Sequence, residues 1–355
     1  ALENGSHEVR YVAAWSLAQV GGDDALEALL GAYWNERAAL REAGSRGIVQ
    51  MAASSSVDAQ TRHRKLRRSD IANDLRYIDD RNHTINTDRL LGSLSKMARQ
   101  VELPRSRGFI DTHRRVIGEA VEAALGQDKP RVQAAVLGAL TGSSGKATFR
   151  ILEPLGNADR KAVGQIVQSV SGRIRQLAEA NTTDVRSPAI RLLGVVSASG
   201  DLPRVLEALA DDDELVRESA AIALGQWKPS HKIVDALRKR LDDDFFAVRV
   251  AAARSIGELV EPEASYASGA TEALVPLLDD DFKTVRAASA GALVRVGTDA
   301  ALSKVDERID GMEPAVKIAA LRALASSERK QAEKILKRYR DHRDIRFRRA
   351  ARGEE

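Results

Sequence analysis

The chain of 355 residues contains no cysteine. It therefore forms no disulfides, thiolate metal sites or cysteine nucleophiles, and we expect it in a reducing compartment such as the cytoplasm. Aromatic residues make up only 4% of the sequence, which suits thin pairs of helices packed on small side chains. No apolar run approaches the roughly 18 residues that a membrane span needs, and no signal-peptide pattern opens the chain. We therefore expect no membrane span, and the sequence leaves open whether the native chain extends before residue 1.

A short phrase returns along the chain at intervals of roughly thirty residues. Its fullest copy runs from Val216-Arg217 through Ala220 to Leu224-Gly225. Other copies begin at Val9-Arg10, Leu40-Arg41, Val185-Arg186, Val248-Arg249, Val285-Arg286, Val316-Lys317 and Ile345-Arg346, with a weaker one at Pro130-Arg131. A fixed period on this scale is typical of a solenoid, in which each unit buries its apolar face against its neighbours. We predict an all-α solenoid, a superhelix of about 9–12 stacked helical hairpins.

Apolar residues within each unit fall at helical spacing. Val216, Ala220 and Leu224 form one stripe of a 3.6-residue period, and Ile233 and Leu237 belong to a second stripe after a turn. Acidic triplets precede the first helix of several units: 211–213, 242–244 and 279–281. Aspartate there caps a helix and complements its dipole. Each unit is therefore predicted to be a helical hairpin with an acidic entry turn.

The phrase D-D-x-x-V-R-x-x-A-A-x-A-L-G resembles the HEAT-like repeat family, in particular the short repeats first associated with phycobilin lyases. The resemblance covers roughly residues 5–52 and 128–352. It implies the helical solenoid and says almost nothing about function.

The rhythm divides the chain into three predicted segments: N-terminal repeats at 1–52, an irregular basic segment at 53–127 and a C-terminal array at 128–355. Residues 53–112 break the period. They are either diverged repeats that continue the stack or an insertion on one face, where repeat proteins often bind. The sequence leaves both interpretations open.

Basic residues gather in three places, although the net charge is only +4. Residues 329–352 hold 11 Lys and Arg against 3 acids, whereas residues 201–300 hold 12 against 19. The resemblance implies that second helices line the concave surface, where their cations form a positive groove for phosphates or an acidic protein segment. A solubilising cap is the alternative for the terminal helix. The candidate binding residues are Arg62, Arg64, Lys65, Arg67, Arg68, Arg238, Lys239, Arg240, Lys330, Lys334, Lys337, Arg338 and Arg340.

No catalytic constellation is assembled by the sequence. The arginines of the phrase are expected to be structural, because the repeat itself imposes their spacing. HEAT-like deoxyhypusine hydroxylase binds iron through several His-Glu pairs, whereas His7-Glu8 is the only such pair in this sequence. Trp15, Trp34 and Trp227 lie too far apart to indicate the aromatic cluster of the HEAT-like DNA glycosylases. We predict no cofactor, no metal and no enzymatic activity.

The leading hypothesis is a non-enzymatic scaffold or adaptor that binds a protein partner on the curved face of the solenoid. The first alternative is a nucleic-acid-binding protein that uses basic concave helices. The second is an enzyme of the same repeat class, such as a bilin lyase or a DNA glycosylase.

Overall fold

The computed structural model describes residues 2–3, 5–33, 38–54, 109–141 and 157–354, and every regular element in these ranges is helical. The chain divides into two compact units, Ala1–Arg173 and Ile174–Glu355. The predicted fold class, an all-α solenoid, is confirmed. The boundaries predicted at 52/53 and 127/128 remain a prediction, since most of the segment between them lies outside the described residues.

The first unit begins with three helices that pack on one another: α1 (His7–Val20), α2 (Asp23–Tyr33) and α3 (Ala38–Ser54). Their interface buries Leu26, Leu29 and Leu40 almost completely. α2 also contacts α8 (Arg114–Leu125), where Asp23 accepts hydrogen bonds from Arg115 at 3.0 Å and pairs with His113 at 3.1 Å. The remaining helices are α7 (Phe109–Thr112), α9 (Pro130–Thr141) and α10 (Asn157–Ser169), followed by α11 (Ser171–Leu177) at the junction of the units.

The second unit repeats one arrangement: a first helix carrying the phrase, then a shorter second helix. The first helices are α12 (Thr183–Val196), α14 (Glu214–Leu224), α16 (Phe246–Leu259), α18 (Lys283–Val296), α20 (Pro314–Ala325) and α22 (Ile345–Arg352). The second helices are α13 (Leu202–Ala208), α15 (His231–Lys239), α17 (Ala267–Leu274), α19 (Asp299–Ile309) and α21 (Lys330–Lys337). Short 3₁₀ turns η2 (Ser199–Asp201), η3 (Arg240–Asp242) and η4 (Val275–Asp279) complete the pairs.

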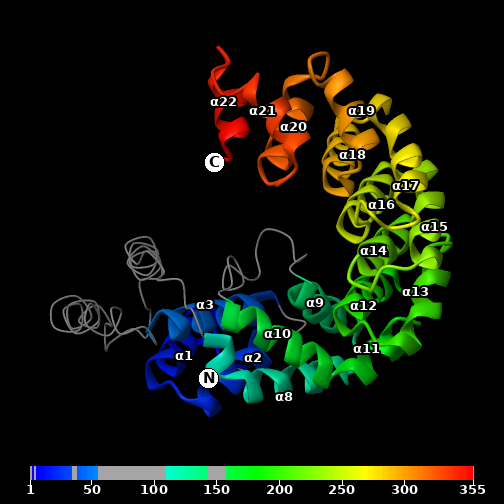
Figure 1. The fold of residues 1–355 in the computed structure, drawn as a ribbon. Coiled ribbons are helices and arrows are strands. Elements are labelled where there is room, and N and C mark those ends of the chain that lie inside the picture. Colours follow the sequence, from blue (N-terminus) through cyan, green and yellow to red (C-terminus); the bar gives the residue numbers. More distant parts are fainter. Residues whose placement is uncertain (1, 4, 34–37, 55–108, 142–156, 355) are drawn as a thin grey trace. The chain divides into compact units, whose positions relative to one another are not determined.

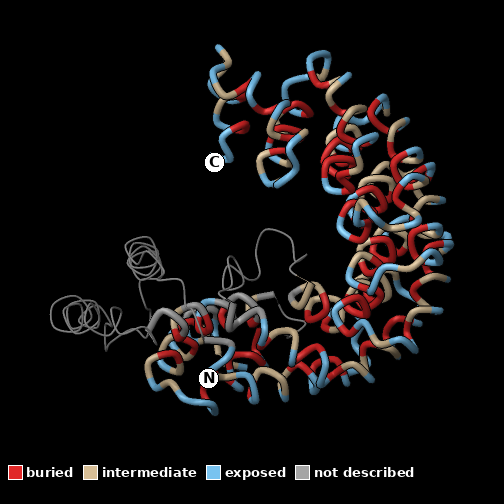
Figure 2. The backbone as a smooth tube through the Cα atoms, in the orientation of Figure 1, coloured by how far each residue is buried: buried red, intermediate tan, exposed pale blue. Residues whose placement is uncertain are grey.

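Each first helix packs against the first helix of the next pair, so the phrase builds a continuous layer. Figure 1 shows α14, α16, α18 and α20 on the inner side of the curve of this unit, and α13, α15, α17 and α19 on its outer side. Buried residues follow the boundary between the two layers (Figure 2). The prediction that second helices line the concave surface is therefore wrong for this unit. The first helices line it.

The glycine that ends the phrase permits this close packing. A Cβ on Gly194 would lie 2.7 Å from the Cα and 2.8 Å from the carbonyl oxygen of Ala223 on the next first helix. A Cβ on Gly257 would meet Ala292 at 2.8 Å in the same way. Because distances under 3 Å are repulsive, these glycines set how near α12 approaches α14 and how near α16 approaches α18.

Two copies of the phrase are shifted by two residues from their predicted positions. In the last copy Phe347 is buried, whereas Ile345 is 57% exposed, so the anchor pair is Phe347-Arg348. In α9 the buried anchor is Val132, not Pro130. In both helices the residue that follows the corrected anchor stands where the phrase arginine stands elsewhere.

Candidate functional site

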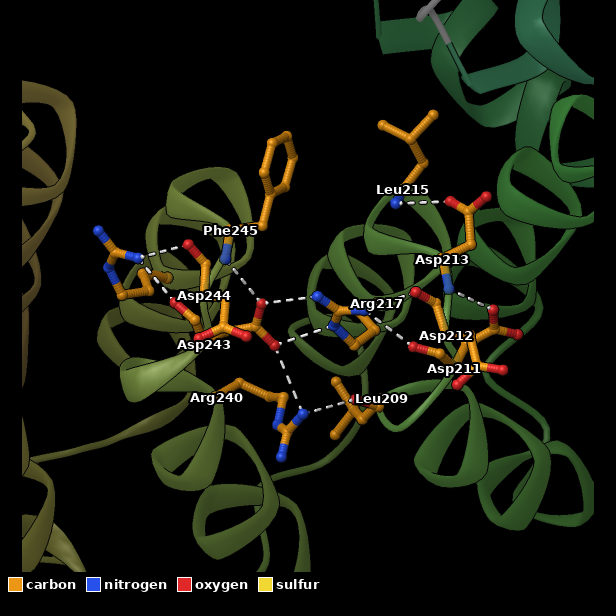
Figure 3. A network of polar contacts seen from close by, with 11 residues as sticks. Leu209, Asp211, Asp212, Asp213, Leu215, Arg217, Arg240, Asp243, Asp244 and Phe245 are labelled. Atoms are coloured by element: carbon orange, nitrogen blue, oxygen red, sulfur yellow. Dashed lines mark hydrogen bonds and ion pairs between the residues drawn. The ribbon is translucent and has the colours of Figure 1, made fainter.

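Successive entry turns are linked by the arginine of each phrase. Arg217 on α14 donates from Nε and Nη2 to both carboxylate oxygens of Asp243, at 2.9 and 3.0 Å (Figure 3). Its Nη1 donates backwards to the carbonyls of Asp211 and Asp212 at 2.9 and 3.1 Å. One guanidinium thus closes its own entry turn and binds the acid of the next turn.

The same geometry recurs along the second unit. Arg249 donates to Asp280 at 2.9 and 3.1 Å and to the carbonyl of Asp243 at 2.7 Å. Arg286 donates to the carbonyl of Asp280 at 2.6 Å and pairs with Glu313 at 2.7 Å. In the first unit, Gln133 donates to the carbonyl of Gln127 at 2.6 Å. The side chains at the arginine position of the phrase therefore have a structural role, in agreement with the expectation from their spacing.

Asp243 is the most enclosed carboxylate of this series, with 3% of its side chain exposed. Burial raises its pKa, but hydrogen bonds from the Arg217 guanidinium and the Phe245 amide outweigh burial and hold the pKa below the usual value. The Asp280 carboxyl has a lowered pKa for the same reasons, through Arg249 and the Phe282 amide. These acids are ionised and paired, so they do not serve as proton donors near neutral pH.

The acidic triplets cap the first helices in two ways. Asp213 is the N-cap of α14, and its carboxylate accepts a hydrogen bond from the Leu215 amide at 2.9 Å. Before α16 and α18 the N-cap is a phenylalanine, and the aspartate two residues earlier accepts the amide of that residue instead. The predicted capping role is correct for Asp213 and displaced by two residues in the other turns.

The predicted basic residues separate into different environments. The run containing Arg62, Arg64, Lys65, Arg67 and Arg68 lies outside the described residues. On α15 and the turn after it, Arg238 pairs with Asp235 at 3.2 Å, and Arg240 donates to the Leu209 carbonyl at 3.1 Å. Arg240 also reaches Asp243 at 3.4 Å, so it belongs to the structural network in Figure 3. Lys239 is exposed.

Helix α21 and the residues directly after it contribute both paired and unpaired cations. Arg338 pairs with Asp306, and Arg340 forms two hydrogen bonds with Glu333, each at 2.7 Å. Lys330, Lys334 and Lys337 are exposed, and none of them forms an ion pair with a described residue. The lysines remain candidate binding residues, whereas the two arginines are occupied within the fold.

A different set of cations lies on the exposed side of the inner layer. Arg254 on α16, Arg295 on α18 and Arg322 on α20 are exposed. No ion pair joins any of them to an acid within the described part of the chain. Apolar side chains half-exposed on the same side of the first helices include Ile222 and Ile318. This mixed surface of guanidinium and aliphatic groups, which we call the inner face, was missed because the sequence interpretation placed the second helices inside.

Arg295 is the most constrained cation of the inner face. Partial burial lowers its pKa, Glu258 nearby opposes this, and the like charge of Arg254 adds to the lowering. An arginine stays protonated under these conditions. The neighbourhood therefore keeps an incompletely neutralised positive charge beside that of Arg254.

The described residues also contain a pocket of about 560 Å³ between the end of α19 and the turns before α18 and α20. Its charged lining is already paired, through Arg286 with Glu313 at 2.7 Å and Arg308 with Asp279 at 3.2 Å. No group of His, Asp or Glu side chains suited to a metal ion occurs in the described ranges. Nor is any helix among them long and apolar enough to cross a membrane.

Family models match both units. The HEAT repeats model matches residues 170–244 and 234–311, and the PBS lyase HEAT-like repeat model matches residues 9–33. These parts of the chain are HEAT-like repeats. Its matched ranges contain the α12–α18 ladder in the second unit and the α1–α2 pair in the first.

Solved structures resemble this chain at low sequence identity. An engineered protein is 17% identical, with coverage of 99% of this chain and 96% of that chain and a TM-score of 0.42. Yeast importin-beta is 13% identical over 97% of this chain and 49% of its own, with a TM-score of 0.47. The CpcE–CpcF complex of phycocyanin lyase from Nostoc is 18% identical over 66% and 85%, with a TM-score of 0.41. No curated protein matches the sequence.

Proposed function

We propose that this chain is a non-enzymatic interaction scaffold that binds a protein partner on the inner face of its second unit. The observation that carries the proposal is the set of exposed arginines Arg254, Arg295 and Arg322, none of which forms an ion pair with an acid in the described ranges. Aliphatic side chains such as Ile222 and Ile318 lie on the same side of the same layer. Arginine beside apolar surface is the composition that protein interfaces favour.

The composition of the inner face favours a protein over a nucleic acid as the partner. The exposed positions five, nine and thirteen residues after the N-caps of α12 to α20 contain no aromatic side chain, so this face offers no platform for stacking bases. The lysines of α21 lie on a second helix, and they remain the candidate surface for the nucleic-acid alternative.

The cytoplasmic location and the absence of enzymatic activity are parts of the same proposal. A chain without cysteine suits a reducing compartment. Among the described acids, Asp243 and Asp280 have low pKa values and are tied to arginines, which suits structural work better than acid–base catalysis. The solved lyase complex shares the repeat fold with this chain, and that likeness alone does not transfer its activity.

A capture experiment tests the proposal with one glutamate introduced on either layer. The purified chain is used as bait in nuclease-treated native lysate, as the wild type, as Ile222→Glu and as Lys232→Glu. Ile222 is half-buried on the inner α14, whereas Lys232 is exposed on the outer α15. We expect the same discrete proteins on wild type and Lys232→Glu and their loss from Ile222→Glu. The absence of discrete captured proteins from the nuclease-treated lysate, or their retention by both variants, would contradict the proposal.

A further inference from the structure

Three guanidinium groups lie at the same distance along their helices, on three consecutive first helices. Arg254 lies nine residues after the N-cap Phe245 of α16, and Arg322 lies nine residues after the N-cap Glu313 of α20. On α18 that position is Gly291, nine residues after Phe282. Arg295, one turn later, fills the place: its Nη1 and Nη2 lie 3.6 and 3.9 Å from where a Cβ of Gly291 would be. Glycine thus leaves room for the guanidinium to return to the level of its neighbours.

The three arginines differ from those of the ladder because none of them forms an ion pair with an acid that the structure describes. Arg217 and Arg249 each hold an aspartate through two hydrogen bonds. Arg254 and Arg322 are exposed and form no ion pair with any residue that the structure describes. Arg295 has Glu258 in its neighbourhood, but also the like charge of Arg254. A row of like charges at this spacing favours an anionic ligand.

The spacing of the row fits an extended polypeptide. Packed helices stand about 8–10 Å apart, so the row places one guanidinium at about that interval. A polyproline II segment rises about 3.1 Å per residue and returns to the same face every third residue, at intervals of about 9 Å. In a regular β-strand successive residues alternate between faces, so a residue three positions after one that faces the row points away from it. On one face of a polyproline II segment, every third residue therefore lies opposite one guanidinium group of the row.

We infer that Arg254, Arg295 and Arg322 bind an extended acidic segment of the partner, with a carboxylate at every third residue. The inference rests on the proposed function and specifies the chemistry of its partner. Carboxylates pair with guanidinium groups in a bidentate geometry, so each repeat contributes one charge-assisted contact. Ile222 and Ile318 lie on the same layer, where they contact aliphatic side chains of the same segment.

The test uses a fluorescein-labelled peptide of about twelve residues with glutamate at every third position and proline or serine elsewhere. Its control is a peptide of the same composition with the glutamates adjacent. Binding is measured by fluorescence anisotropy at about 0.1 M salt, where exposed charges are not fully screened. The proteins are the wild-type chain, Arg254→Gln/Arg295→Gln/Arg322→Gln and Lys330→Gln/Lys334→Gln/Lys337→Gln. The two variants lose equal charge, and circular dichroism checks that each is folded.

We expect the arginine variant to weaken binding of the spaced peptide at least about tenfold and the lysine variant to change it less than about twofold. The adjacent-glutamate peptide should bind the wild type more weakly than the spaced one. Equal losses in both variants, or equal binding of both peptides, would overturn the inference. Stronger binding of a single-stranded oligonucleotide to the same arginines would overturn it too.

Failure of this inference is distinguishable from failure of the proposed function. If captured proteins depend on Ile222 but the spaced peptide does not bind, the inner face is an interaction surface for a partner of different chemistry, and the acidic segment is rejected. If the peptide binds through the three arginines but no captured protein depends on Ile222, the arginine row is an anion-binding site and the scaffold proposal is rejected.

Discussion

Asp243→Asn is expected to lower the free energy of unfolding of the second unit by about 3 kcal/mol. The Asp243 carboxylate receives hydrogen bonds from Arg217, Arg240 and the Phe245 amide while 3% of its side chain is exposed. The neutral amide keeps the shape of the side chain but leaves two partly buried guanidinium groups without an anion. Chemical denaturation followed by circular dichroism measures the change.

The matched control comes from the same acidic triplet. Asp244 is exposed, and only its backbone carbonyl takes part in the ladder, by accepting a hydrogen bond from Arg249 at 3.2 Å. Asp244→Asn should therefore change stability by less than about 0.5 kcal/mol. Equal effects of the two substitutions would show that the triplet acts through net charge and not through the paired carboxylate.

The pH dependence gives a second readout of Asp243. Its pKa in the folded chain is below the unfolded value, so its contribution is present at neutral pH and is lost as pH falls through the folded pKa. The difference in stability between wild type and Asp243→Asn should therefore shrink below about pH 4. A difference that persists unchanged to lower pH would indicate a packing effect of the amide.

Gly194→Ala is expected to destabilise the second unit by about 2 kcal/mol, although alanine is the better helix former. Its new methyl group would lie 2.7 and 2.8 Å from backbone atoms of Ala223, which cannot rotate away as a side chain does. Helices α12 and α14 must then separate, and the hydrophobic contact between them weakens. Denaturation midpoints measure the loss.

Gly291→Ala is the matched control, for which we expect stabilisation and not destabilisation. Gly291 also lies within a first helix, but its Cβ would contact only the end of the Arg295 side chain, at 3.6 Å or more. The substitution should stabilise α18 by up to about 1 kcal/mol through helix propensity. If both alanines stabilise the chain, the phrase glycine does not set the approach of the first helices.

The repeat and its helices follow from the sequence because their causes are local and periodic. Val216, Ala220 and Leu224 lie at helical spacing and are buried, and Arg217 recurs because each turn needs the same donor. The sequence predicts less reliably where the phrase begins within its helix. Pro130-Arg131 and Ile345-Arg346 look like the phrase, but the anchors are Val132 and Phe347. Counting three residues from the N-cap, as from Asp344 to Phe347, identifies the correct anchor.

The candidate site depends on contacts between repeats, which the sequence does not display. The acid that neutralises Arg338 is Asp306, on the preceding second helix. The three inner-face arginines do not all occupy one place in the phrase, because Arg295 lies one turn later than Arg254 and Arg322 and its guanidinium returns beside Gly291. Which layer is on the inner side of the curve depends on how pairs stack, and the helical period is the same in both layers. For these reasons charge runs pointed to the lysines of α21, and the inner face became visible only in the structure.

The most direct test of the account is a photo-crosslinking scan in native lysate, with a photoreactive amino acid placed at one position at a time. Ile222 on α14 and Ile318 on α20 report on the inner layer, and Lys232 on α15 and Glu272 on α17 report on the outer layer. We predict a discrete protein adduct at both inner positions and none at the outer positions. Adducts confined to α15 and α17 would contradict the assignment of the binding surface to the first helices.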